Sequence, residues 1–157
     1  MREPSPFFIR DATADDVDEI ARLGHVFYEE AGWADIAEWD EASIKVTLSS
    51  LIDNTAGIVL VLCRKGVISG IAGGMVYPVY FNHAHKTGQE LFWWLTPDQR
   101  DGGGKGLLDA LEAAAKARGA QSWAMIALDM LRPEAIGAVY QRRGYRPSER
   151  TFIKRLV

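Results

Sequence analysis

The sequence predicts a single α/β domain in which helices cover a mixed sheet. Three observations support this prediction. The 157 residues suit one compact domain, and 48% hydrophobic with 25% charged residues is close to the globular average. Strand-like and helix-like apolar patterns follow one another in the order β-α-α-β-β-β-α-β-α-β. Since no repeat or linker interrupts this order, residues 1–157 are expected to form one domain.

The first third of the chain predicts a strand and two helices. The short apolar run Phe7–Arg10 is typical of a strand. A helix to about Ala31 should follow, capped by Thr13 or Asp15. Its apolar residues recur at helical spacing: Val17, Ile20, Ala21, Leu23, Gly24 and Phe27. A second helix is expected from about Trp39 to Leu51.

The middle of the chain predicts three strands. Ile58–Arg64 and Val67–Tyr77 flank a short polar link that contains a glycine, which is typical of an antiparallel hairpin. The segment Pro78–Gly88 is expected to be irregular. Glu90–Leu95 is apolar on both faces, which favours a central strand.

The last third predicts two helices and two strands. A helix from about Lys105 to Arg118 ends at Gly119, which suits a helix terminus. A fifth strand is expected at Trp123–Leu128, a helix from Pro133 to about Arg143, and a final strand at Phe152–Leu156.

Composition excludes several classes of protein. The lone Cys63 rules out an internal disulfide framework and a thiolate-cluster metal site. The longest apolar runs are far too short to span a membrane. The first residues, MREPSP, lack the apolar core of a signal peptide, so a cytoplasmic protein is expected. A net charge of −3 makes nucleic-acid binding unlikely on composition.

Charge is unevenly distributed along the chain. Residues 1–41 contain twelve acidic and three basic side chains, whereas residues 141–157 contain six basic and one acidic. This asymmetry is typical either of two ligand surfaces of opposite sign or of two solvated faces.

A glycine-rich segment, Gln99-Arg-Asp-Gly-Gly-Gly-Lys-Gly106, lies between a predicted strand and a predicted helix. Glycines allow backbone N–H groups to approach an anion, and a helix N-terminus adds partial positive charge. Arg100 and Lys105 supply further positive charge. The segment matches neither a Walker A loop nor a dinucleotide fingerprint. It indicates a phosphate site, with a flexible helix start that binds nothing as the alternative.

Three motifs together resemble the GNAT superfamily of N-acyltransferases. Gln99-x-x-Gly102-x-Gly104 is similar to the Q/R-x-x-G-x-G/A loop of that family. Val139–Tyr145 is similar to its second signature, Y-x-x-x-G-F/Y, and Ile9–Asp16 to its first strand and the start of its first helix. The resemblance covers nearly the whole chain. Pro133 departs from it, since many members have Asn there.

The resemblance implies a mostly antiparallel sheet with splayed fourth and fifth strands, flanked by about four helices, and acetyl-CoA as cosubstrate. Backbone groups of Trp94, Leu95 and Thr96 would then bind the pantetheine arm. The pyrophosphate would lie against the glycine-rich segment, formed by Arg100, Asp101, Gly102, Gly103, Gly104, Lys105 and Gly106. The implied reaction moves an acetyl group from acetyl-CoA to a primary amine by direct attack in a ternary complex.

Two residues are the catalytic candidates implied by the resemblance. Tyr140 occupies the position that protonates the departing thiolate in many relatives, although the same residue could simply be a half-buried core aromatic. Glu90 is the candidate base, with Gln89 as its competitor, because only one of two successive strand residues can face the acceptor. His83 and His85 are alternative candidates for the base. The two histidines could also bind a metal ion, but no third ligand is evident, so no metal is expected.

The acceptor is expected near the first two helices. Six carboxylates there flank Trp33 and Trp39, which favours a cationic amine, either a small molecule or a protein amino group. The alternative function is an acyl-CoA-binding regulatory or protein-interaction module without turnover. A homodimer is possible.

Overall fold

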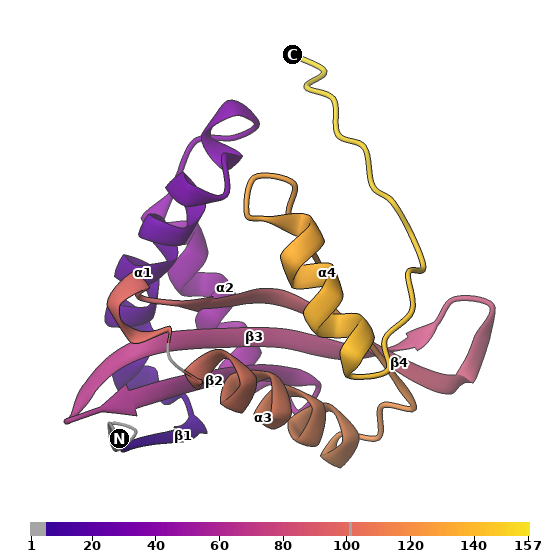
Figure 1. Ribbon diagram of the computed structural model, residues 1–157, viewed down its shortest axis with the longest axis horizontal. Helices are drawn as coiled ribbons and strands as arrows, with labels where there is room; N and C mark the ends of the chain where they lie inside the picture. Colours follow the sequence, from indigo (N-terminus) through magenta and orange to yellow (C-terminus); the bar gives the residue numbers. More distant parts are fainter. Residues whose placement is uncertain (1–5, 101) are drawn as a thin grey trace.

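The computed structural model describes residues 6–100 and 102–157 and has one five-stranded sheet (Figure 1). The strands lie side by side in chain order: β1 (Phe7–Asp11), β2 (Gly57–Arg64), β3 (Val67–Val79), β4 (Asn82–Leu95) and β5 (Ser122–Ala124). Neighbours are antiparallel, except that β4 and β5 are parallel. The prediction of a mixed, mostly antiparallel sheet is confirmed.

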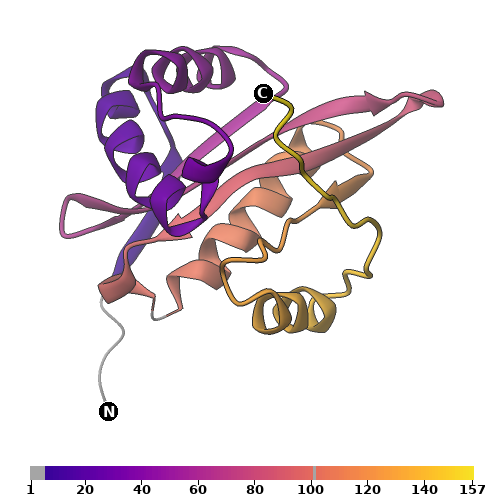
Figure 2. The same ribbon diagram turned by 90° about the horizontal axis from the view of Figure 1, so that it is seen from above.

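Helices cover both faces of this sheet, as Figures 1 and 2 show. One face packs against α1 (Val17–Glu30) and α2 (Glu41–Asp53), and the other packs against α3 (Gly103–Ala117). The fourth helix, α4 (Pro133–Arg142), lies beyond the β4 side of the sheet. All eight residues of β2 are buried because helices cover this strand from both sides.

The hairpin of β3 and β4 is longer than predicted. The expectation that Pro78–Gly88 is irregular was wrong, because Tyr77 pairs with Thr87 and Pro78 with Lys86. This end of the hairpin projects beyond the helices and is largely exposed (Figure 1). Without a buried face, its residues show none of the apolar alternation that marks a strand.

The pairing of β4 with β5 is short. It runs from Thr87, opposite Ser122, to Gln89, opposite Ala124. Beyond Gln89, β4 continues to Leu95 with only β3 as partner. The two strands therefore diverge at this point, as implied by the resemblance, and the paired part of the fifth strand ends four residues before the predicted Leu128.

A β-bulge lies where β4 leaves its partner. Phe92 pairs with Gly73 and Glu90 with Gly74, so Leu91 is one extra residue. A bulge turns two successive side chains toward the same side, and Leu91 and Phe92 both line one cavity on the α1 and α2 face. The bulge thus sets the direction of the side chains on both sides of Glu90.

The predicted final strand, Phe152–Leu156, is wrong. This segment has no strand structure, and its residues are exposed. A strand needs a neighbouring edge to pair with, and β5 has only three paired residues. Among the described residues, no helix combines the length and the apolarity that a membrane crossing requires.

Candidate active site

The glycine-rich segment forms the start of α3. Gly102 has a φ of 83°, a left-handed conformation that favours glycine. A Cβ on Gly103 would come within 2.7 Å of Leu95 Cδ2, so this glycine lets the helix approach β4 closely. Gly104 has more space, since its nearest contact would be at 3.5 Å. First-turn N–H groups have no acceptor within the helix, which makes this end suitable for an anion.

A cavity of about 260 Å³ opens between this helix end, β4 and α4. Three cations line it, Arg100, Lys105 and Arg143, together with the ring of Trp93. The Trp93 Nε1–H donates to the Gly104 carbonyl at 3.2 Å, which joins the cavity wall to the glycine turn. An apolar groove with three cations at its margin suits a long ligand that carries phosphates at one end.

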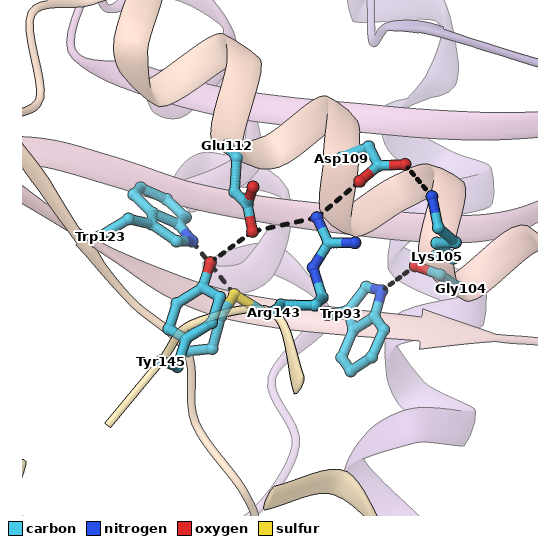
Figure 3. A network of polar contacts seen from close by, with 9 residues as sticks. Trp93, Gly104, Lys105, Asp109, Glu112, Trp123, Arg143 and Tyr145 are labelled. Carbon is cyan, nitrogen blue, oxygen red and sulfur yellow. Dashed lines mark hydrogen bonds and ion pairs between the residues drawn. The ribbon is translucent and has the colours of Figure 1, made fainter. Parts of the chain in front are cut away.

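A polar network joins α3 to the end of α4 (Figure 3). Arg143 Nη2 lies 2.5 Å from Asp109 Oδ1 and 3.2 Å from Glu112 Oε1. Lys105 Nζ contacts the other Asp109 oxygen at 2.9 Å, and the Tyr145 hydroxyl donates to Glu112 at 2.8 Å. Hydrogen bonds from Lys105 and Arg143 lower the pKa of Asp109. The network fixes the spacing of two helices that both line the cavity.

The remaining predicted cofactor residues lie at the end of β4. Arg100 donates through Nε to the Leu95 carbonyl at 3.1 Å, and its Nη2 lies 3.4 Å from Glu30 Oε2. The Trp94 indole donates to the same Glu30 oxygen at 2.8 Å.

The backbone groups predicted to bind the pantetheine arm do not all point to the same side of β4. The Thr96 N–H donates to the Ser69 carbonyl, toward β3. Backbone groups alternate in direction along a strand, so those of Leu95 face the open edge. Asp101 lies outside the described residues.

Glu90 lies where β4 and β5 separate. Its side chain is buried, and its Oε2 accepts the Ile126 N–H at 2.9 Å. Burial raises the pKa of the Glu90 carboxyl to about 7, and this hydrogen bond opposes the increase. The competitor, Gln89, is only partly buried and pairs through its backbone with Met75 and Ala124. A carboxyl group with a pKa near neutral can accept a proton at physiological pH.

Tyr140, on α4, faces the same place. Its hydroxyl donates to the Ile126 carbonyl at 2.8 Å, and its ring lies 5.8 Å from that of Trp93. Burial raises the pKa of the Tyr140 phenol well above its usual value, and the nearby charge of Glu90 raises it further. The phenol therefore keeps its proton, and the structure brings the two catalytic candidates together on one residue.

The histidines lie elsewhere. His83 is exposed on the projecting hairpin, and His85 Nε2 lies 3.0 Å from Ser122 Oγ. Within residues 6–100 and 102–157, no group of three or more His, Cys, Asp or Glu side chains is arranged to hold a metal ion.

Several of the carboxylates expected near an acceptor have structural partners. Asp40 caps α2, Glu41 pairs with Lys45 at 2.9 Å, and Glu30 contacts Trp94 and Arg100. Trp33 and Trp39 line a second cavity, of about 190 Å³, on the α1 and α2 face.

Sequence reasoning missed two residues of this site. Ile126 contributes only backbone groups, so its side chain gives no signal. Arg143 directly precedes Gly144 in the second motif, but from the sequence it was assigned no role beyond being one of the basic residues of segment 141–157. Its pairing with α3 depends on helix packing that the sequence pattern does not specify.

The family model described as "Acetyltransferase (GNAT) family" matches residues 17–145. No curated protein sequence matches the chain.

Solved structures with the same fold share little sequence with the chain. A predicted acetyltransferase with acetyl-CoA from Clostridium acetobutylicum is 18% identical, with a TM-score of 0.76 over 96% of this chain and 97% of that one. A ribosomal-protein-alanine N-acetyltransferase from Brucella melitensis biovar Abortus is also 18% identical, with a TM-score of 0.71 over 97% and 100%. An aminoglycoside acetyltransferase from an uncultured soil metagenomic sample is 16% identical, with a TM-score of 0.73 over 97% and 99%. Their names point to different acceptors, so the shared fold leaves the acceptor open.

Proposed function

The chain belongs to the GNAT family of acetyltransferases, and from this premise we propose that it transfers the acetyl group of acetyl-CoA to a primary amine by direct attack in a ternary complex. The observation that carries the proposal is the shared contact of Glu90 and Tyr140 with Ile126, at the point where β4 and β5 separate. A base and an acid are held there within one small region, beside the groove of three cations.

The residues present suit acetyl-CoA. The glycine turn at Gly102 and the first-turn N–H groups of α3 would hold the pyrophosphate, with Lys105 and Arg143 beside it. The outward backbone groups of Leu95 would bind the amide-bearing arm once Arg100 releases the Leu95 carbonyl. Bound there, acetyl-CoA supplies an activated acetyl group as a thioester.

Glu90 and Tyr140 would divide the proton transfers. Glu90 takes one proton from the protonated amine, directly or through water, so that the nitrogen lone pair can form the new C–N bond. Breaking of the C–S bond leaves a thiolate, to which Tyr140 gives its proton, and the second proton that the nitrogen loses on becoming an amide restores the tyrosine. This requires the Tyr140 hydroxyl to leave the Ile126 carbonyl. A protonated phenol and a carboxylate with a pKa of about 7 are both in the required state just above neutral pH.

The test is CoA release from acetyl-CoA by the wild-type chain with a panel of primary amines. Turnover with at least one amine, together with N-acetyl product by mass spectrometry, supports the proposal. Binding of acetyl-CoA without turnover by any amine would overturn it in favour of a binding module. A cytoplasmic setting and a homodimer stay predictions.

A further inference from the structure

We propose that the acceptor is a hydrophobic amine, with a body about the size of one aromatic ring that fills the cavity between α1, α2 and β4 and a short arm that carries the amine toward Glu90. This inference rests on the proposed function and names the substrate class of the same site. It favours an aryl-alkyl amine over a polyamine or an aminoglycoside.

The cavity is apolar and partly open. Aromatic rings from α1, from the segment between α1 and α2 and from β4 form much of its wall: Phe27, Tyr28, Trp33, Trp39 and Phe92. Its volume is about 190 Å³. A cavity of about 150 Å³ lined by apolar side chains is enough for a benzene ring. A polyhydroxylated acceptor would leave its hydroxyls without hydrogen-bond partners here, which disfavours its binding.

The wall of this cavity is built rather than accidental. Gly24 of α1 lies against the indole ring, since a Cβ at this position would be 3.4 Å from Trp39 Cη2. The Trp39 ring stacks on His25, with centroids 4.9 Å apart and an interplanar angle of 14°. The Tyr28 hydroxyl donates to the Ala37 carbonyl at 2.6 Å, which holds the connection between α1 and α2 against the cavity.

The β-bulge joins the cavity to the reaction centre. Leu91 and Phe92 line the cavity and directly follow Glu90 in β4. Glu90 pairs with Gly74, and its side chain lies on the α3 side of β4, opposite the cavity. Beyond Gln89 the edge of β4 has no strand partner, so the arm would pass this open edge to approach Glu90. Leu91 lies at this edge and is 46% exposed, and a ligand body would cover it.

Charge at the margin suits a cation. The segment Glu29–Glu41 carries six carboxylates and no Lys, Arg or His. Side chains from elsewhere face some of them: Arg100 pairs with Glu30, Lys45 pairs with Glu41, and the His25 ring lies 3.6 Å from Glu29. The net charge at this margin stays negative, and its carboxylates Asp35 and Glu38 are exposed. Such a margin attracts a protonated amine, whereas the wall attracts its apolar body.

The experiment measures kcat/KM for 2-phenylethylamine, methylamine, spermidine and kanamycin by CoA release. We expect 2-phenylethylamine to exceed each of the others at least 10-fold. Trp33→Ala and Leu91→Gln change partly exposed wall residues, so the fold should tolerate them. Both should lower the ratio of kcat/KM for 2-phenylethylamine to kcat/KM for methylamine about 10-fold. Val46→Ala, on the exposed face of α2, is the matched control and should change neither.

A clear preference for spermidine or kanamycin, with turnover intact, overturns this inference and leaves the proposed function standing. If no amine is acetylated, calorimetric binding of 2-phenylethylamine decides the inference separately. Binding by the wild type that Trp33→Ala weakens supports it. Absence of binding, or equal binding by both proteins, overturns it.

Discussion

Glu90 and Tyr140, fifty residues apart in the chain, hold the two backbone groups of one residue. The carboxylate of Glu90 accepts the Ile126 N–H, and the hydroxyl of Tyr140 donates to the Ile126 carbonyl. These contacts replace the strand pairing that β5 loses after Ala124. The same two side chains therefore stabilise the backbone where β4 and β5 separate, and they lie where they can take part in a reaction between the two strands.

Replacing Glu90 by Gln should lower kcat for amine acetylation by about 10²–10³-fold, because the base is lost while the acceptor for the Ile126 N–H is kept. Only the carboxylate form is a base, so wild-type activity should rise with pH through about 7. The residual activity of the variant should lack this step in a pH–rate profile. An unchanged profile in E90Q would exclude Glu90 as the base.

The same substitution should make the stability less dependent on pH. Burial raises the pKa of Glu90 in the folded protein to about 7 from its ordinary value of 4.5, so the folded protein binds the proton more tightly than the unfolded chain does. This carboxyl therefore favours the folded state below about pH 4.5, and stability falls as the pH rises toward 7. At pH 8, E90Q should be more stable than the wild type by about 3 kcal/mol. Urea unfolding of both proteins at pH 5 and pH 8 measures the difference.

Tyr140→Phe should lower kcat by about 10²-fold and change the KM for acetyl-CoA little, since it removes the acid but keeps the ring against Trp93. Because the pKa of Tyr140 is raised, no loss of activity from its ionisation is expected up to pH 10. Tyr145→Phe is a suitable control, because it loses a hydroxyl that contacts Glu112 instead. Equal effects of the two substitutions would assign Tyr140 a structural role.

Gly104→Ala should separate ligand binding from folding. The added methyl meets only ordinary contacts at 3.5 and 3.6 Å, so stability should be unchanged or rise by up to about 1 kcal/mol. The methyl also enters the cavity that we assign to acetyl-CoA, so the KM for acetyl-CoA should rise about 10-fold. Gly103→Ala is the contrasting variant and should destabilise the fold, because its methyl would collide with Leu95 and Leu62. Normal acetyl-CoA kinetics in G104A would place the phosphates elsewhere.

Arg143→Met should cost about 1–2 kcal/mol of stability, because the bridge from α4 to Asp109 and Glu112 is lost. It should also raise the KM for acetyl-CoA and weaken the dependence of that KM on salt, since the cavity loses one of three cations. Arg142→Met, at the exposed neighbouring position, is the matched control. If both variants respond to salt in the same way, Arg143 does not contact the cofactor.

Most of the sheet and the helices could be predicted because the spacing of apolar residues in the sequence follows which side of each element is buried. The fully buried β2 and the helical spacing in α1 are examples. The far end of the β3 and β4 hairpin could not be predicted, since two exposed strands hold each other by backbone bonds alone. The prediction of a strand at Phe152–Leu156 failed for the opposite reason: the segment has the composition of a strand but is exposed and unpaired.

Residues of the site could be predicted only where they lie within a local sequence motif. The turn at Gly102 and the position of Tyr140 follow from the two motifs. The side to which each residue near Glu90 turns depends on the bulge at Leu91, which is set by pairing across Gly73 and Gly74. A Cβ on Gly73 would come within 2.4 Å of the Phe92 ring, so the bulge depends on side-chain packing between the two strands of the hairpin, which the pattern of either strand alone does not specify.

The short pairing of β4 with β5 divides the domain into two parts of unequal stability. β1 to β4 share long ladders and a core on both faces, whereas β5 pairs with β4 over only three residues, and α4 is joined to the rest by side-chain contacts, among them those at Ile126, Trp93 and Arg143. Local opening of the second part therefore requires far less free energy than global unfolding. Amide hydrogens near Ile126 should exchange with solvent before those of β2, and a ligand that fills the gap between the strands would join the two parts into one cooperative unit.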